Sequence, residues 1–322
     1  MLQKNNEKNA SVEIIKEAYL DLGYVCSRKI ATAIYLSGHL QKPLLIEGPP
    51  GVGKTELARA TAKYLDAPLI RLQCYEGLDE SKALYEWKYS KQLLYIQLLK
   101  EQLGDIMHGA QGLEESMVRL HQFGDVFYSN EFLEPRPLLQ ALREEDGSVL
   151  LIDEIDKADQ EFEAFLLEIL SDYQISIPEI GTVRAHKPPV VFLTSNNTRE
   201  LSDALKRRCL HLYIPFPDSA LEQQIIHTRV PDVREDVRTQ LVDFVQALRQ
   251  RELKKVPAIS ETIDWARTLV LLEAGSLDAD LVRDTLNVLL KYQDDIEAVE
   301  PEINGLVQQV LKGETTGGPI PR

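Results

Sequence analysis

Residues 48–55 contain glycines, a lysine and a threonine at a spacing that suits the phosphate groups of a nucleotide. The segment matches G-x-x-x-x-G-K-[ST] at every fixed position. Glycines let backbone N–H groups turn toward phosphate oxygens, the lysine contacts the β- and γ-phosphates, and the threonine hydroxyl ligates Mg²⁺. The candidate phosphate-binding residues are Gly48, Pro49, Pro50, Gly51, Val52, Gly53, Lys54 and Thr55. We expect Lys54 to be an exposed loop lysine and Thr55 to be a metal ligand.

Two adjacent carboxylates follow an apolar run further along the chain. Val149 to Ile152 is continuous and apolar, and Asp153 and Glu154 come directly after it. At the tip of a strand, Asp153 can hold a Mg²⁺ ion and Glu154 can polarise a water for attack on a γ-phosphate. Alone this pattern is weak, but downstream of a complete phosphate-binding motif it predicts ATP hydrolysis with Mg²⁺.

Short apolar runs with the composition of buried strands must position these groups. They lie at 43–47, 69–72, 149–152 and 190–193, and amphipathic helical patterns occur between them. Alternation of strands and helices predicts an α/β domain with a mostly parallel sheet. Residues 174–184, with a proline and a glycine, predict a β-hairpin. After Pro217 the pattern is purely helical, and one helical face collects Val237, Leu241, Phe244, Val245 and Leu248.

Composition and net charge argue against several classes of protein. The net charge of −15 over 322 residues argues against a surface that grips a nucleic-acid backbone, because such surfaces are basic. No secretory signal pattern opens the chain, and no apolar run approaches the ~18 residues of a membrane span. Three widely spaced cysteines predict reduced thiols rather than disulfides or a zinc site. We therefore expect a cytoplasmic protein.

The order of these motifs resembles that of an AAA+ ATPase over about residues 25–310. The phosphate-binding loop is followed by the strand ending in Asp153-Glu154, a later strand ending in Thr194-Ser195-Asn196, the pair Arg207-Arg208 and a helical region. The resemblance implies a P-loop NTPase fold with a small α-helical lid. We expect an N-terminal helical segment (1–24), an ATPase core (25–217) with a helical insertion at about 80–132, a helical lid (218–310) and a flexible tail (311–322).

Within AAA+ proteins the chain is similar to the MoxR group, because of the insertion and of the hairpin before the Asn196 strand. The stretches at 71–79 and 83–87 are similar to the CoxD-like branch tied to carbon monoxide dehydrogenase maturation. This resemblance implies a ring, expected to be a hexamer, that acts as a chaperone on a protein client. A protein with a von Willebrand factor A domain is the partner that it implies.

The resemblance also assigns roles to single residues. Asn196 matches an amide that orients the attacking water or senses the γ-phosphate; an ordinary Asx turn is the alternative. Arg208 matches an arginine finger that acts on the next subunit's nucleotide, with Arg207 as the alternative finger and a solvated basic patch as the alternative to both. One departure is that Thr262 occupies the position where the family's lid helix usually carries a sensor arginine, and Arg267 is expected to face elsewhere.

Two further questions stay open at the level of sequence. Tyr85, Trp87 and Tyr89 could form a central-pore loop that grips a client, or could pack the inserted element. A nucleic-acid motor or loader and a non-catalytic nucleotide switch are the alternative functions. The net charge argues against the first, and the intact Asp153-Glu154 pair argues against the second.

Overall fold

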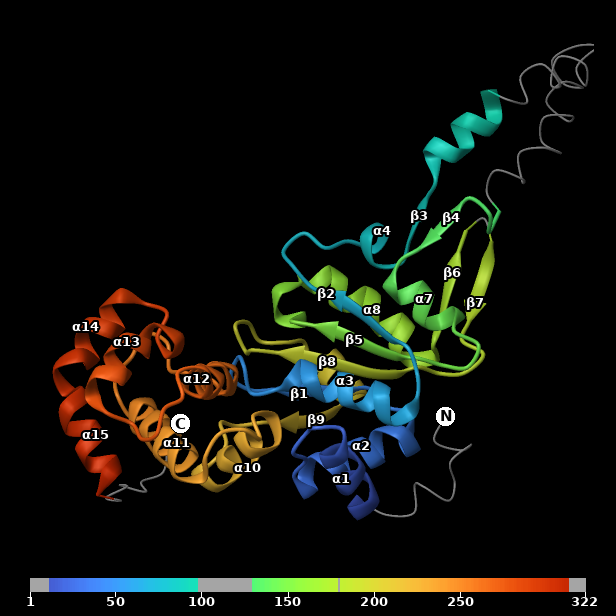
Figure 1. Cartoon of the computed structure of the whole chain (residues 1–322). Coiled ribbons are helices and arrows are strands. Elements are labelled where there is room, and N and C mark those ends of the chain that lie inside the picture. The colour runs from blue at the N-terminus through green and yellow to red at the C-terminus, as the bar shows by residue number, and fades with distance from the viewer. Residues whose placement is uncertain (1–11, 98–128, 179, 313–322) are drawn as a thin grey trace, which may run out of the picture. The chain divides into compact units, whose positions relative to one another are not determined.

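The computed structural model describes residues 12–97, 129–178 and 180–312 (Figure 1). Most of the predicted insertion, residues 98–128, and most of the predicted tail lie outside these residues. The chain forms two compact units. The first comprises mainly Leu36–Leu45 and Leu65–Leu210, and the second comprises mainly Ile46–Tyr64, His211–Arg322 and the chain up to Tyr35.

A parallel five-stranded sheet carries the motifs, with the strand order β2-β5-β8-β1-β9. Its strands are β1 (Leu44–Glu47), β2 (Leu69–Gln73), β5 (Val149–Asp153), β8 (Val190–Ser195) and β9 (Leu210–Tyr213). Every residue of β5 is buried, as expected for a central parallel strand. The first four strands confirm the predicted ones. The fifth, β9, was not predicted.

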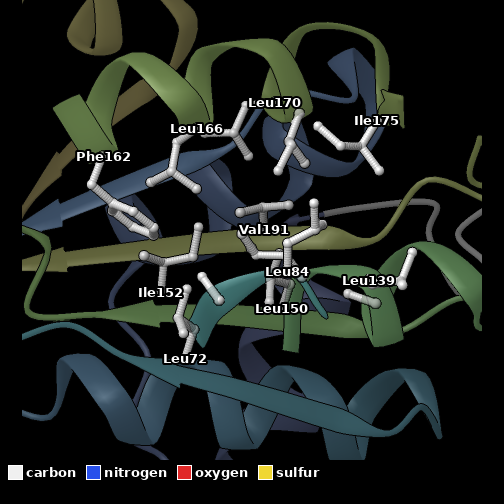
Figure 2. Close-up of a cluster of buried hydrophobic side chains, with 14 of the residues drawn as sticks. Leu72, Leu84, Leu139, Leu150, Ile152, Phe162, Leu166, Leu170, Ile175 and Val191 are labelled. Atoms are coloured by element: carbon white, nitrogen blue, oxygen red, sulfur yellow. The ribbon is translucent and has the colours of Figure 1, made fainter. Parts of the chain in front are cut away.

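The core of the first unit lies between the sheet and its helices, among them α8 (Gln160–Asp172). The Asp159 side chain caps α8 by accepting a hydrogen bond from the Phe162 N–H at 2.8 Å. Phe162, Leu166 and Leu170 of α8 point toward Ile152 and Val191 of the sheet (Figure 2). The amphipathic helix predicted between the third and fourth apolar runs is thus confirmed. Its apolar face packs against β5, the strand that leads to Asp153 and Glu154.

Smaller elements complete the first unit. They are α2 (Arg28–Leu40, in part), α4 (Glu80–Ala83), β3 (Tyr85–Trp87), β4 (Leu133–Pro135), α7 (Pro137–Arg143), β6 (Gln174–Ile177), β7 (Gly181–Arg184) and α9 (Asp203–Arg208). The strands β6 and β7 pair antiparallel, which confirms the predicted hairpin. Trp87 is buried in the core, whereas the Tyr89 side chain is 65% exposed. The three aromatic residues therefore do not act as one exposed group.

The second unit is helical apart from strand ends. Its elements include α1 (Val12–Asp21), α3 (Lys54–Leu65), α10 (Ser219–Arg229), α11 (Glu235–Arg249), α12 (Ile259–Leu271), α13 (Ala279–Leu289), α14 (Gln293–Val299) and α15 (Ile303–Leu311). All five residues of the predicted apolar face of α11 are buried. Phe244 packs on Trp265 of α12, and the Trp265 indole N–H donates to the Thr285 hydroxyl at 2.8 Å.

Two general expectations were tested by the fold. None of the described helices is long and apolar enough to cross a membrane. The three cysteines are buried and form no disulfide. Burial raises the pKa of Cys26, Cys74 and Cys209 to about 12, so all three are neutral thiols at physiological pH.

Candidate active site

The phosphate-binding motif forms the turn between β1 and α3, as its sequence predicts, and α3 begins at Lys54. The expectation of an exposed lysine is wrong, because Lys54 is only 7% exposed. Its ammonium group donates to the Gly48 carbonyl at 2.7 Å and to the Pro49 carbonyl at 2.8 Å. The side chain folds back over its own loop because a buried ammonium group needs hydrogen-bond acceptors.

Two glycines of the phosphate-binding loop, Gly48 and Gly51, lie where the loop packs closely against other segments of the same chain. A Cβ atom on Gly48 would lie 2.1 Å from the Ile214 carbonyl oxygen, which is backbone and cannot move aside. Gly51 has φ +75° and a Cβ there would lie 2.5 Å from the Ala258 Cβ. The motif glycines therefore serve close packing of the loop as well as the approach of a ligand.

A cavity of about 220 Å³ lies beside this loop in the second unit. Its walls are mainly apolar and come from the chain before α2, from the loop and from the helical region; the lining includes Tyr24, Val25, Val52, Ile214, Leu221 and Ile259. Glu56 and Arg229 are its charged lining residues, and they form an ion pair at 3.1 Å. No local sequence pattern predicts this cavity, because its walls come from segments about 200 residues apart.

Asp153 and Glu154 lie at the tip of β5 beside the end of β8. Asp153 is 3% exposed, and its Oδ1 accepts a hydrogen bond from the Thr194 hydroxyl at 2.5 Å. The Glu154 N–H donates to the same hydroxyl at 2.9 Å. Glu154 has the left-handed conformation φ 57°, ψ 49°, which is uncommon for a residue other than glycine and is concentrated at functional sites. Thr194 thus holds the Asp153 carboxylate and the backbone of Glu154 in this strained turn.

The Glu154 carboxylate has three side-chain partners. It accepts hydrogen bonds from Gln73 at 2.9 Å and from Asn196 at 3.4 Å, and it pairs with Lys157 at 2.7 Å. The bond to Glu154 raises the pKa of Lys157. The structure therefore brings Glu154 and Asn196 together, as the sequence predicts. Gln73 and Lys157 were not predicted.

Asp156 is a further residue that sequence analysis missed. Its Oδ2 accepts the Asn196 N–H at 3.2 Å, the Thr198 N–H at 3.0 Å and the Thr198 hydroxyl at 2.6 Å. Burial alone would raise the pKa of Asp156, but these hydrogen bonds outweigh it and the pKa lies below its usual value. Asp156 thereby fixes the backbone that carries Asn196. The sequence signal that could have identified Asp156 is its place in a short run that holds three acidic residues, from Asp153 to Asp156.

Arg208 is the last residue of α9, and its side chain is exposed to solvent. Its Nε donates to the Ser171 hydroxyl at 2.7 Å, and an Nη donates to the Ala204 carbonyl at 3.4 Å. Arg207 is also exposed. Both guanidinium groups therefore lie at the exposed C-terminal end of this helix.

Thr262, at the position of the expected sensor arginine, is fully buried. Its hydroxyl donates to the Glu222 carboxylate at 2.9 Å. Glu222 also pairs with Arg249 through two hydrogen bonds of 2.6 and 2.7 Å, and both side chains are almost completely buried. This network joins α10, α11 and α12. Arg267, as expected, faces elsewhere, being exposed and paired with Asp264 of its own helix.

We expect Arg249→Ala to destabilise the second unit by about 3–5 kcal/mol, because it leaves the Glu222 charge buried without its partner. Urea unfolding followed by circular dichroism measures the change. Arg251→Ala is the matched control, since Arg251 pairs with Glu302 at the surface and its loss should cost less than about 1 kcal/mol. Equal losses in the two variants would contradict the prediction.

The chain is similar in sequence or in fold to several known proteins. A family model described as "AAA domain (dynein-related subfamily)" matches residues 43–209. Uncharacterized proteins of Staphylococcus aureus, from strains bovine RF122 / ET3-1 and USA300, are 26% identical over 238 residues, which is 72% of this chain and 76% of theirs. The Thermotoga maritima RuvB Holliday junction branch migration motor is 20% identical with a TM-score of 0.42, covering 88% of this chain and 69% of that chain. A mutant of the same RuvB is 19% identical with a TM-score of 0.47, covering 88% and 72%.

Proposed function

Because this chain belongs to the AAA domain family, dynein-related subfamily, we propose that it is an ATPase that uses Mg²⁺. The family and its P-loop fold imply nucleotide binding. The observation that carries the step to hydrolysis is the cluster at the tips of β5 and β8, where Glu154 is held in a left-handed turn and its carboxylate meets the Asn196 amide. A site that only bound nucleotide would not need a carboxylate held beside an amide donor.

In this proposal Lys54 binds the phosphates, and Glu154 and Asn196 act on the attacking water. Lys54 exchanges its two loop carbonyls for the β- and γ-phosphate oxygens, which are stronger partners for an ammonium group. Glu154 accepts a proton from the attacking water, and the Asn196 amide orients that water. Because β1, β8 and β5 are neighbours in a parallel sheet, the segments that follow them leave from the same edge of it.

Mg²⁺ would be held by Asp153 and Thr55 together with phosphate oxygens, and it would neutralise charge on the phosphates. The donors fit this ion, because a carboxylate and a hydroxyl are hard oxygen ligands. Within the described residues no group of three or more His, Cys, Asp and Glu could hold a metal ion. In proteins, Mg²⁺ usually binds through one or two carboxylates and substrate phosphates rather than in a site built only from protein ligands.

The apolar cavity beside the loop is proposed to take the adenine base. A flat, largely apolar base fits walls such as Val25, Val52 and Ile259, and the phosphates would then extend toward Lys54. We further propose that residues 218–310 act as the lid over this nucleotide. The buried Thr262 leaves the lid without its usual sensor arginine, and Arg229, which lines the cavity, is the lid residue that supplies a cation there.

At the level of biology we propose a cytoplasmic MoxR-like ring, a hexamer, which remodels a protein client. The motif order and the β6–β7 hairpin support the MoxR group, and the stretch at 71–79 supports its CoxD-like branch. A partner with a von Willebrand factor A domain is part of this proposal. The exposed Arg208 supports a ring, because a finger at the surface can act on a neighbouring subunit.

Lys54→Ala tests the nucleotide site. We expect nucleotide affinity to fall at least about tenfold, because a hydrogen bond from a charged group contributes roughly 1.5–3 kcal/mol. Titration with a fluorescent ATP analogue measures the affinity. Since Lys54 is buried, thermal unfolding of the variant must be compared as well. Lys63→Ala, an exposed lysine on the same helix, is the control and should bind normally. Unchanged affinity in a folded Lys54→Ala protein would refute the site.

A further inference from the structure

The carboxylate of Asp153 is already fully engaged in this structure. Its Oδ2 accepts two hydrogen bonds from the Arg71 guanidinium, 3.0 Å from Nε and 2.6 Å from Nη2. Its Oδ1 accepts the Thr194 hydroxyl at 2.5 Å. A carboxylate that is 3% exposed requires such partners, since an isolated buried charge is costly. Arg71 therefore brings a positive charge to this buried carboxylate.

The position of Arg71 makes it a releasable partner. Arg71 and Gln73 are two residues apart on β2, an edge strand of the sheet, and so lie on the same face of it. Gln73 is directly opposite Asp153 in the strand register. The Arg71 side chain is 46% exposed, whereas that of Asp153 is buried. An exposed arginine on a sheet edge can move into solvent without leaving a cavity in the core.

Arg71 also connects the two carboxylates of the site. Its Nη2 donates to the Gln73 amide oxygen, and the Gln73 amide nitrogen donates to Glu154 at 2.9 Å. One hydrogen-bonded chain thus runs from Asp153 through Arg71 and Gln73 to Glu154. Movement of Arg71 changes the partners of the metal ligand and of the proposed base together.

We propose that Arg71 occupies the Asp153 carboxylate in place of the divalent cation, and that Mg²⁺ binds in competition with it. The inference rests on the proposed Mg²⁺-dependent nucleotide binding. Both cations need the lone pairs of the same carboxylate, and a guanidinium and Mg²⁺ at one buried oxygen repel each other. Arg71 is a positioning residue in this scheme. It holds the Asp153 carboxylate in place before the metal arrives, and it makes metal binding the event that releases Gln73 and Glu154.

The opposite role makes the opposite prediction. If Arg71 stayed in place and oriented Asp153 toward the metal, its removal would weaken Mg²⁺ binding. If it competes, its removal strengthens Mg²⁺ binding. The sign of the change in Mg²⁺ affinity therefore distinguishes the two roles.

The experiment titrates Mg²⁺ into the full-length protein with a fluorescent, non-hydrolysable ATP analogue and records the Mg²⁺ midpoint for tightened analogue binding. Binding in EDTA gives the Mg²⁺-free reference for each protein. We expect Arg71→Gln, which removes the charge but keeps an amide, to lower the midpoint about tenfold, the scale of losing one repelling charge at a partly exposed site. Arg184→Gln, an exposed arginine on β7, is the matched control and should keep the wild-type midpoint.

Arg71→Lys provides a second test that does not depend on the folding of the first variant. Lysine keeps the charge but loses the two-bond grip, so it competes less well and its midpoint should also fall below that of wild type. A midpoint that is unchanged or raised in the folded variants overturns the proposal. If wild-type protein binds the analogue equally well with and without Mg²⁺, the proposed function fails instead.

Discussion

Glu154→Gln is expected to bind ATP with wild-type affinity and to hydrolyse it at least ~10²-fold more slowly. A neutral amide cannot accept the proton of the attacking water, and loss of a positioned base usually has an effect of this size. The substitution keeps the shape of the side chain. Gln73 and Asn196 donate to different carboxylate oxygens, of which the amide keeps one, and the ion pair with the exposed Lys157 is lost. Phosphate release and analogue binding, measured on the same preparation, separate the two steps.

The control for this variant is Glu161→Gln. Glu161 lies in the exposed first turn of α8, seven residues further along the chain, so its replacement removes the same charge from the same unit. It should leave turnover unchanged. Turnover near wild type in Glu154→Gln would show that another group activates water. Absence of hydrolysis in the wild-type protein itself, with binding retained, would instead favour a nucleotide switch.

Mixing two inactive proteins is expected to restore activity. Arg208→Ala should bind ATP normally and hydrolyse it ~10³-fold more slowly, because a guanidinium finger stabilises the charge that develops on the transferred phosphoryl group. In a mixed ring with Glu154→Gln, some interfaces join an intact Glu154 to an intact Arg208 of the neighbour. The specific activity of the mixture should therefore exceed that of either protein alone, as phosphate release measures.

The outcome depends on which subunit supplies the finger. A finger that acted within its own chain could not be rescued by mixing, since each chain lacks one essential group. No recovery in rings shown by native mass spectrometry to be mixed would count against the shared site. If Arg207→Ala is inactive and Arg208→Ala is active, the ring proposal stands and the finger is Arg207, which lies beside it at the exposed end of α9.

Much of the fold could be predicted from local patterns. Apolar runs marked the strands that end at Asp153 and Ser195, and helical spacing marked the buried face of α11. Burial on both sides of a parallel strand and on one side of a helix imposes those patterns directly. The pattern did not reveal β9 or α7, because β9 is short and half polar and α7 follows a proline close to an insertion.

The sequence by itself determined the chemistry available to this protein. The turn of residues 48–55 and the pair Asp153-Glu154 are runs of covalent neighbours, so their side-chain types and spacing can be read directly. Only the tertiary structure decided the state of these groups. It buries Lys54 under its own loop, pairs Asp153 with Arg71 and encloses Thr262 beside Glu222. Each of these contacts depends on strand register or helix packing between residues that are distant in the chain, or on how a loop folds over its own side chain, and no local pattern of residue types encodes either.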